Sequence, residues 1–255
     1  MKSTTILGAL DPELTERVLS RRDAVMNTGK MTGALALASM PVAFGLMARS
    51  AFAQGSGLPG EIISVLNFAL TLEYLEDDFY RGGIDSGVIP SGDLPIFQSI
   101  SSHETAHVAL LSAAISSGGG TPAGKPAFDF TAGGTFPNPY TDYPTFQALA
   151  QAFEDTGVRA YKGQAGALIS NDAILTTALQ IHSVEARHAS AVRRLRGQKG
   201  WITGNQTDLP AAAAAVYAGE EAANGAATSA AAAEAFDEPL TMDQVNAIAG
   251  LFIVS

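Results

Sequence analysis

The chain has 255 residues, of which 47% are hydrophobic and 16% are charged, and this is ample apolar material for a folded core. It has no cysteine, which excludes a disulfide scaffold, an iron–sulfur cluster, thiol catalysis and a cysteine-ligated zinc site. Residues 1–53 carry six Lys/Arg and four Asp/Glu, whereas residues 54–255 carry nine Lys/Arg and 21 Asp/Glu, a net charge of −12. The negative charge of residues 54–255 repels the phosphate backbone of nucleic acids and attracts cations, so no nucleic-acid partner is expected.

The first 53 residues have the pattern of an export signal. Ser20-Arg21-Arg22 precedes 18 uncharged residues from Met31 to Ala48, and Ala51-Phe52-Ala53 forms a small-residue cleavage site. This order indicates a secretory signal, and paired arginines after a serine resemble the twin-arginine type. We therefore expect an exported bacterial protein of the periplasm or cell envelope. The alternative is an uncleaved segment that anchors the chain to a membrane, although 18 residues are at the short limit for a span.

Four long helical patterns follow, separated by clusters of Gly, Pro, Asn and Asp. They predict helices at 60–81, 93–117, 144–169 and 172–197. Glycines supply the stop signals after three of these helices: Gly82-Gly83, Gly118-Gly119-Gly120 and Gly197. The inner face of the last helix is expected to comprise Leu175, Ala178, Leu179, His182, Glu185, Ala189 and Val192.

Connection lengths predict the topology. The short links within the first and second helix pairs indicate two antiparallel hairpins. The connection at 118–143 reaches about 80 Å when extended, more than the ~37 Å of a 25-residue helix. The predicted fold is therefore all-α, a ferritin-like four-helix bundle at 54–197 whose two hairpins are joined by one long crossover. An Ala-rich helical extension follows at 198–255.

Two parts of the extension have different expected behaviour. Residues 211–235 are mostly alanine and carry little to bury. The stretch from Thr241 to Ile253 has the pattern of a short capped helix with an apolar face. We expect this tail to pack on the bundle or on a neighbouring copy.

Two Glu-x-x-His motifs, Glu104 to His107 and Glu185 to His188, each place both side chains on one helical face. The other two helices each carry a glutamate followed seven residues later by a tyrosine. Each residue of the first half has its counterpart 81 positions later: Glu73 and Glu154, Tyr80 and Tyr161, Glu104 and Glu185, His107 and His188, Ile100 and Ile181, Ser102 and Ser183. The two hairpins are therefore predicted to be pseudo-symmetric copies.

Four carboxylates and two imidazoles in one bundle core suit two divalent ions, because the carboxylates neutralise the four positive charges. Without metal, four glutamates facing one core would repel one another and cost several kcal/mol each to desolvate. The predicted ions are two of iron or manganese, and the predicted ligands are Glu73, Glu104, His107, Glu154, Glu185 and His188.

Neighbouring side chains compete with some of these ligands. Glu76 and Asp77 lie one turn from Glu73, but their counterparts at the 81-residue offset are Gly157 and Val158, so symmetry favours Glu73. All four histidines fall in the second and fourth helices. The two outside the motifs, His103 and His182, are predicted either to support the ligands or to be capped core histidines, rather than to bind metal.

Residues 60–197 resemble the ferritin-like superfamily, in particular exported ferritin-like domain proteins akin to desiccation-related proteins. The resemblance is carried by Asn67 to Glu76, Ser102 to His107, Phe153-Glu154, His182 to His188 and, in the tail, Phe236 to Thr241. It implies that Glu104 and Glu185 bridge the ions, that Glu73 and Glu154 are terminal, and that His107 and His188 bind one ion each. It also implies that Tyr80 and Tyr161 lie near the site. We expect these two tyrosines to be the catalytic residues, either by supplying or relaying an electron or by donating hydrogen bonds to ligand carboxylates.

The expected function is redox chemistry on peroxide or on dioxygen and ferrous iron, of the ferroxidase, peroxidase or catalase type, in stress protection. The main alternative is a non-catalytic structural or stress-protection protein that keeps the bundle. Iron storage ranks third, because no clear short fifth helix follows the fourth. The expected partners are metal ions and small oxidants; assembly into a homo-oligomer is left open, and a membrane is a partner only if the N-terminal segment is retained.

Overall fold

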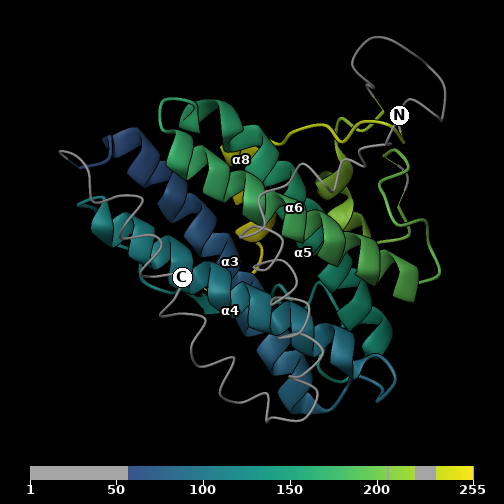
Figure 1. Cartoon of the computed structure of the whole chain (residues 1–255). Coiled ribbons are helices and arrows are strands. Elements are labelled where there is room, and N and C mark those ends of the chain that lie inside the picture. Colours follow the sequence, from purple (N-terminus) through teal and green to yellow (C-terminus); the bar gives the residue numbers. More distant parts are fainter. Residues whose placement is uncertain (1–56, 206, 222–233, 255) are drawn as a thin grey trace, which may run out of the picture. The chain divides into compact units, whose positions relative to one another are not determined.

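The computed structural model describes residues 57–205, 207–221 and 234–254, so the signal-like segment at 1–53 lies outside the described residues. Four long helices form the body of the molecule (Figure 1): α3 (Gly60–Ser86), α4 (Leu94–Ser117), α5 (Tyr143–Gln164) and α6 (Asp172–Leu195). α3 packs along α4 and α5 along α6, and the two hairpins meet through α3 with α5 and α4 with α6. This is the predicted all-α bundle. Within the described residues, none of the helices is long and apolar enough to cross a bilayer.

The predicted end of the first helix is wrong. α3 continues through Gly82 and Gly83 to Ser86 and ends at Gly87, whose φ of 73° is the left-handed conformation of a helix cap. The two earlier glycines serve packing instead. A Cβ at Gly82 would lie 2.4 Å from the ring of Tyr140, and one at Gly83 would lie 2.2 Å from the ring of Phe146. Their missing side chains let aromatic rings approach the helix.

The third helix, by contrast, ends earlier than predicted. α5 gives way after Gln164 to a 3₁₀ turn, η3 (Ala165–Leu168). The second and fourth helices begin where predicted, to within one residue, and Asn171 caps α6 by accepting a hydrogen bond from the backbone of Ile174. On α6, Leu179 is 48% exposed, so its predicted place on the inner face is wrong.

Two apolar clusters fill the bundle on different sides of a buried polar centre. One is aromatic and contains Tyr80, together with Phe79, Phe97, Phe146 and Phe153. The other is aliphatic and contains Tyr161, together with Leu66, Leu70, Leu111, Ile115 and Ile174. The two tyrosines that the sequence pairs at the 81-residue offset therefore lie in different surroundings.

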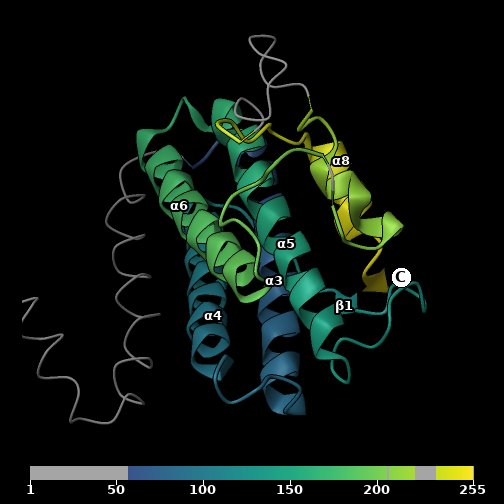
Figure 2. The same ribbon diagram turned by 90° about the vertical axis from the view of Figure 1, so that its right-hand side faces the viewer.

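The crossover and the C-terminal tail meet beside α5 (Figure 2). In the crossover, β1 (Ala127–Phe128) pairs antiparallel with β2 (Ile253–Val254) near the end of the chain. α8 (Met242–Ala249) precedes β2 in the chain and begins with a capping box between Thr241 and Gln244. α8 packs on α5 and α3, so the tail packs on the bundle.

The extension is anchored by a charged residue of α5. Arg159 is completely buried, its Nε lies 2.9 Å from Oε1 of Glu220, and its Nη2 donates a 2.7 Å hydrogen bond to the carbonyl of Ala218. η4 (Ala211–Tyr217) lies in the same segment, and the Tyr217 hydroxyl donates to Asp155 over 2.6 Å. The expectation that 211–235 has little to bury is wrong for its described part, because Tyr217 and Glu220 are buried by α5.

A glycine marks the closest approach of the tail to the bundle. A Cβ at Gly163 would lie 2.0 Å from the backbone oxygen of Leu240, whereas a Cβ at Gly166 would meet nothing within 4 Å. We expect Gly163→Ala to lower the free energy of unfolding by about 1–3 kcal/mol. The added methyl group would collide with the backbone of Leu240, which cannot move aside as a flexible side chain can. Urea denaturation measures this, with Gly166→Ala as the matched control. Equal stability of the two variants would show that the tail does not dock at Gly163.

Candidate metal centre

The six predicted ligands come together in the bundle core. Their potential ligand atoms form two groups, and within each group all lie within 4.8 Å of one another. The glutamates are completely buried and the histidines are at most 7% exposed. Glu104 and Glu185 belong to both groups, which are Glu73, Glu104, His107 and Glu185, and Glu104, Glu154, Glu185 and His188.

The distances repeat the pseudo-symmetry of the sequence. Nδ1 of His107 lies 3.1 Å from Glu73 Oε2, and it is 3.0 Å from Glu104 Oε2 and 3.1 Å from Glu185 Oε1. Nδ1 of His188 has the matching set of neighbours. It lies 2.9 Å from Glu104 Oε1, 3.3 Å from Glu154 Oε2 and 3.6 Å from Glu185 Oε2. Each histidine thus turns one ring nitrogen toward three carboxylates from three different residues.

Each tyrosine reaches across to the glutamate of the other hairpin. The Tyr80 hydroxyl of α3 donates to Oε1 of Glu154, and the Tyr161 hydroxyl of α5 donates to Oε1 of Glu73. Burial, and next the adjacent glutamate charge, raise the pKa of both tyrosines well above its usual value. Both hydroxyls therefore stay protonated and donate. Each leaves the second oxygen of its glutamate turned toward the neighbouring histidine.

One of the two remaining histidines contacts the cluster. Nε2 of His188 lies 2.9 Å from Nδ1 of His103, and the two rings stack with centroids 5.1 Å apart. The two nitrogens share one hydrogen bond, whose direction depends on the tautomers of the two rings, and His103 is exposed. His182 makes no such contact: its Nε2 is buried without a hydrogen-bond partner among the described residues.

The two rival ligands on α3 have different positions. Asp77 accepts hydrogen bonds from Arg81 over 2.8 Å and Thr105 over 2.6 Å, and it belongs to neither group. Glu76 is only 3% exposed, and its Oε1 would lie 3.6 Å from a Cβ placed on Gly157. A Cβ at position 157 would make only an ordinary contact with the Glu76 carboxylate, so the position of Glu76 does not depend on the glycine. Sequence reasoning took Gly157 as evidence against Glu76 as a ligand and missed that Glu76 is a fifth buried carboxylate of the core.

The electrostatics divide the carboxylates into two kinds. Burial raises the pKa of Glu73 to about 8 and raises that of Glu154 well above its usual value. Burial acts the same way on Glu104 and Glu185, but the close approach of the two histidines outweighs it and lowers their pKa. Without metal, protons on the histidines and on Glu73 and Glu154 therefore balance the buried charge. A divalent cation would displace these protons.

A comparison with known families agrees with this geometry. The model of the ferritin-like domain matches residues 61–198, which span all four long helices and all six clustered side chains. The chain belongs to the ferritin-like domain family. A search of curated proteins finds no match for this chain. Membership of the ferritin-like family makes metal binding the first property to examine at the cluster, and the closer resemblance to desiccation-related proteins stays a prediction.

The chemistry of the residues in this ferritin-like core is itself suited to binding metal ions. Several buried polar atoms of the cluster lie close to one another without the alignment of a hydrogen bond: Glu104 Oε1, Glu154 Oε2, both carboxylate oxygens of Glu185, and His188 Nδ1. Buried polar atoms without partners are costly, and native proteins keep few of them without a reason. Carboxylate oxygens and imidazole nitrogens, with no sulfur, suit iron and manganese. The cluster could therefore hold metal ions.

Proposed function

We propose that the cluster binds two divalent ions, of iron or manganese, and serves redox chemistry on dioxygen or peroxide. The observation that supports this best is the pair of overlapping groups that share Glu104 and Glu185. Two carboxylates common to both groups suit two ions side by side, about 3.5–4 Å apart. One histidine for each group, His107 or His188, leaves further coordination positions for a small oxidant.

When two ferrous ions are bound, they supply two electrons, enough to convert one hydrogen peroxide and two protons into two water molecules, or one dioxygen and two protons into one hydrogen peroxide. The chain's own residues prepare the site for this. The hydroxyls of Tyr80 and Tyr161 hold Glu154 and Glu73 in position, and His103 holds the ring of His188. Complete burial of the four glutamates excludes bulk water.

We expect the metal-loaded protein to oxidise ferrous ion with dioxygen or peroxide faster than the free metal does in buffer. His107→Ala should lower the bound metal from two ions to one and abolish turnover. Tyr80→Phe should keep both ions and slow turnover by about 10–100-fold, the effect usual for residues that orient metal ligands. Metal analysis and stopped-flow absorbance measure the two quantities.

His182→Ala is the matched control for this experiment, because His182 lies on the same helix as His188 and belongs to neither group. It should retain two ions and the wild-type rate. If the loaded wild-type protein is no faster than free metal, the enzymatic proposal is wrong. The non-catalytic alternative, a structural or stress-protection protein that keeps the bundle, then remains.

We also infer export to the periplasm or cell envelope, supported by Ser20-Arg21-Arg22 and by Ala51-Phe52-Ala53. Replacing Arg21 and Arg22 with lysine should retain the full-length chain in the cytoplasm of a bacterial host. Arg17→Lys is the control, and cell fractionation is the measurement. Equal export of the double variant and the control would reject a twin-arginine signal.

A further inference from the structure

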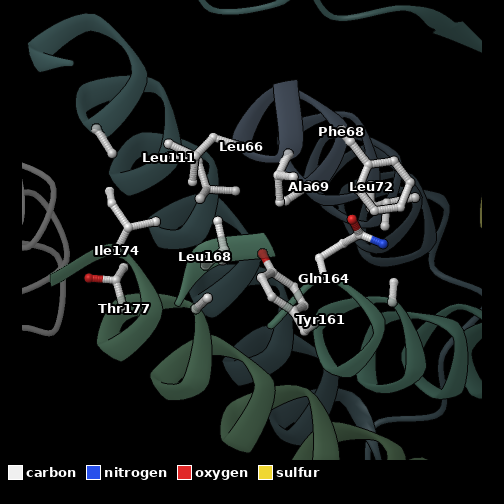
Figure 3. A pocket seen from close by; sticks show the side chains of 14 residues that line it. Leu66, Phe68, Ala69, Leu72, Leu111, Tyr161, Gln164, Leu168, Ile174 and Thr177 are labelled. Carbon is white, nitrogen blue, oxygen red and sulfur yellow. The ribbon is translucent and has the colours of Figure 1, made fainter. Parts of the chain in front are cut away.

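A small apolar cavity lies beside Tyr161 in the aliphatic half of the bundle (Figure 3). Its volume is about 20 Å³, and the surface that faces it is entirely apolar. Side chains of α3, α4, α5, α6 and η3 line it, among them Leu66, Leu111, Leu168 and Ile174. The Tyr161 ring forms part of its wall.

The matching place beside the other tyrosine is filled by rings. Tyr80 packs against three phenylalanines, with ring centroids 5.4 Å away for Phe79, 6.1 Å for Phe97 and 6.2 Å for Phe146. All four rings are completely buried. On this side of the cluster, aromatic packing closes the way to the carboxylates.

The 81-residue offset explains the difference between the two sides. The residues that correspond to the three rings are Ala160 for Phe79, Ala178 for Phe97 and Val65 for Phe146. All three of these small residues line the cavity beside Tyr161. The cavity therefore lies at the place where three rings pack in the other half. The pseudo-symmetry is kept for the ligands and broken for the packing around one tyrosine.

The cavity is one side chain away from the carboxylate cluster. The Tyr161 hydroxyl donates to Glu73, and Glu73 belongs to the same group as His107. A volume of about 20 Å³ exceeds the ~10–15 Å³ that one water molecule requires, so the cavity has room for one molecule of about that size. A much larger apolar cavity, of ~150 Å³, stays dry and accepts apolar guests such as xenon, and an apolar lining favours the same kind of guest here. Hydrogen peroxide would lose its hydrogen bonds on entry, whereas dioxygen has none to lose.

We propose that this cavity takes up dioxygen and passes it along Tyr161 to the carboxylate cluster. The reduction of the dioxygen at the cluster rests on the proposed function. In that reaction, one dioxygen molecule takes one electron from each of two ferrous ions and, with two protons, becomes hydrogen peroxide. Uptake by the cavity does not rest on it, because the lining is formed by the chain alone. Dioxygen is thus the oxidant that this side of the bundle selects.

Xenon tests the uptake independently of metal and turnover. In crystals of the full chain under xenon pressure, anomalous scattering should place one xenon atom among Leu66, Leu111 and Leu168. Ala178→Phe, which restores the ring found at the matching position, should remove it. Ala178→Leu gives a milder filling if the larger ring hinders folding. Leu179→Phe adds the same ring at an exposed position of the same helix and should leave xenon bound.

Two xenon results would overturn the proposal: no xenon in the wild-type cavity, or equal xenon occupancy in the filled variants. Kinetics test the delivery. In the iron-loaded protein, filling the cavity at Ala178 should raise KM for dioxygen about tenfold and change the rate with peroxide little. Equal slowing with both oxidants, or no change in KM, would also overturn it. If the loaded wild type turns over neither oxidant, the proposed function fails, and the xenon experiment still decides whether the cavity accepts such a guest.

Discussion

Without metal, the protein is expected to lose stability as the pH rises from 5 to 8. The pKa of Glu73 is raised to about 8 and that of Glu154 is raised well above its usual value. In this range the native state therefore holds protons that the unfolded chain releases, and the free energy of unfolding falls with pH. The raised pKa of His107 and His188 acts in the same direction above pH 6.5. Each group contributes up to about 1.4 kcal/mol per pH unit.

Metal should reverse this loss, because divalent ions replace the protons. A hundredfold excess over the dissociation constant adds about 2.7 kcal/mol to the free energy of unfolding, and the gain should grow with pH as protons compete less. Urea midpoints at several pH values, with manganese or with chelator, measure both effects. Glu73→Gln should flatten the pH dependence without metal and weaken the response to metal.

The control is Glu61→Gln, which changes an exposed glutamate on the same helix and should behave as wild type. Two observations would contradict this account. One is metal-free stability that rises or stays level between pH 5 and 8. The other is a wild-type unfolding curve that chelation leaves unchanged at every pH.

Replacing Arg159 with methionine is expected to cost about 3–5 kcal/mol, the usual cost of leaving one member of a buried ion pair without its partner. Arg159 is completely buried and Glu220 is 1% exposed. The variant would strand the Glu220 carboxylate and remove donors from the backbone carbonyls of Val216 and Ala218. The extension should then separate from α5, and proteolysis should cleave it at lower protease concentrations.

A second substitution distinguishes stranded charge from lost packing. Arg159→Met with Glu220→Gln should recover part of the stability, because no buried carboxylate is left without its cation. Arg187→Met, at an exposed position of α6, is the control and should change stability little. A loss below about 1 kcal/mol in the single variant would show that this ion pair does not hold the extension.

The bundle and the convergence of the six side chains could be predicted because both follow from spacing. Residues three apart share a helical face, and an offset of 81 residues between two hairpins places Glu73 opposite Glu154 and Glu104 opposite Glu185. Apolar residues at helical spacing also carried the prediction that the four patterns pack around one core. None of these inferences requires knowledge of a contact between distant side chains.

The predictions that were wrong concern features that depend on contacts between residues far apart in the sequence. Gly82 and Gly83 have the pattern of a helix stop, but the rings of Tyr140 and Phe146 press on them and the helix continues. Leu179 has an apolar side chain at a position that the packing of α6 leaves exposed. Tyr217 is buried because α5 supplies Asp155 as its hydrogen-bond acceptor, which composition alone does not reveal.

Anomalous diffraction from crystals of the full chain, soaked anaerobically in manganese or ferrous ion, tests the central claim most directly. Two peaks are expected inside the bundle, about 3.5–4 Å apart, one in the group that contains His107 and one in the group that contains His188. Glu104 and Glu185 should contact both peaks. Peaks confined to surface carboxylates, with none between the four glutamates, would contradict the account.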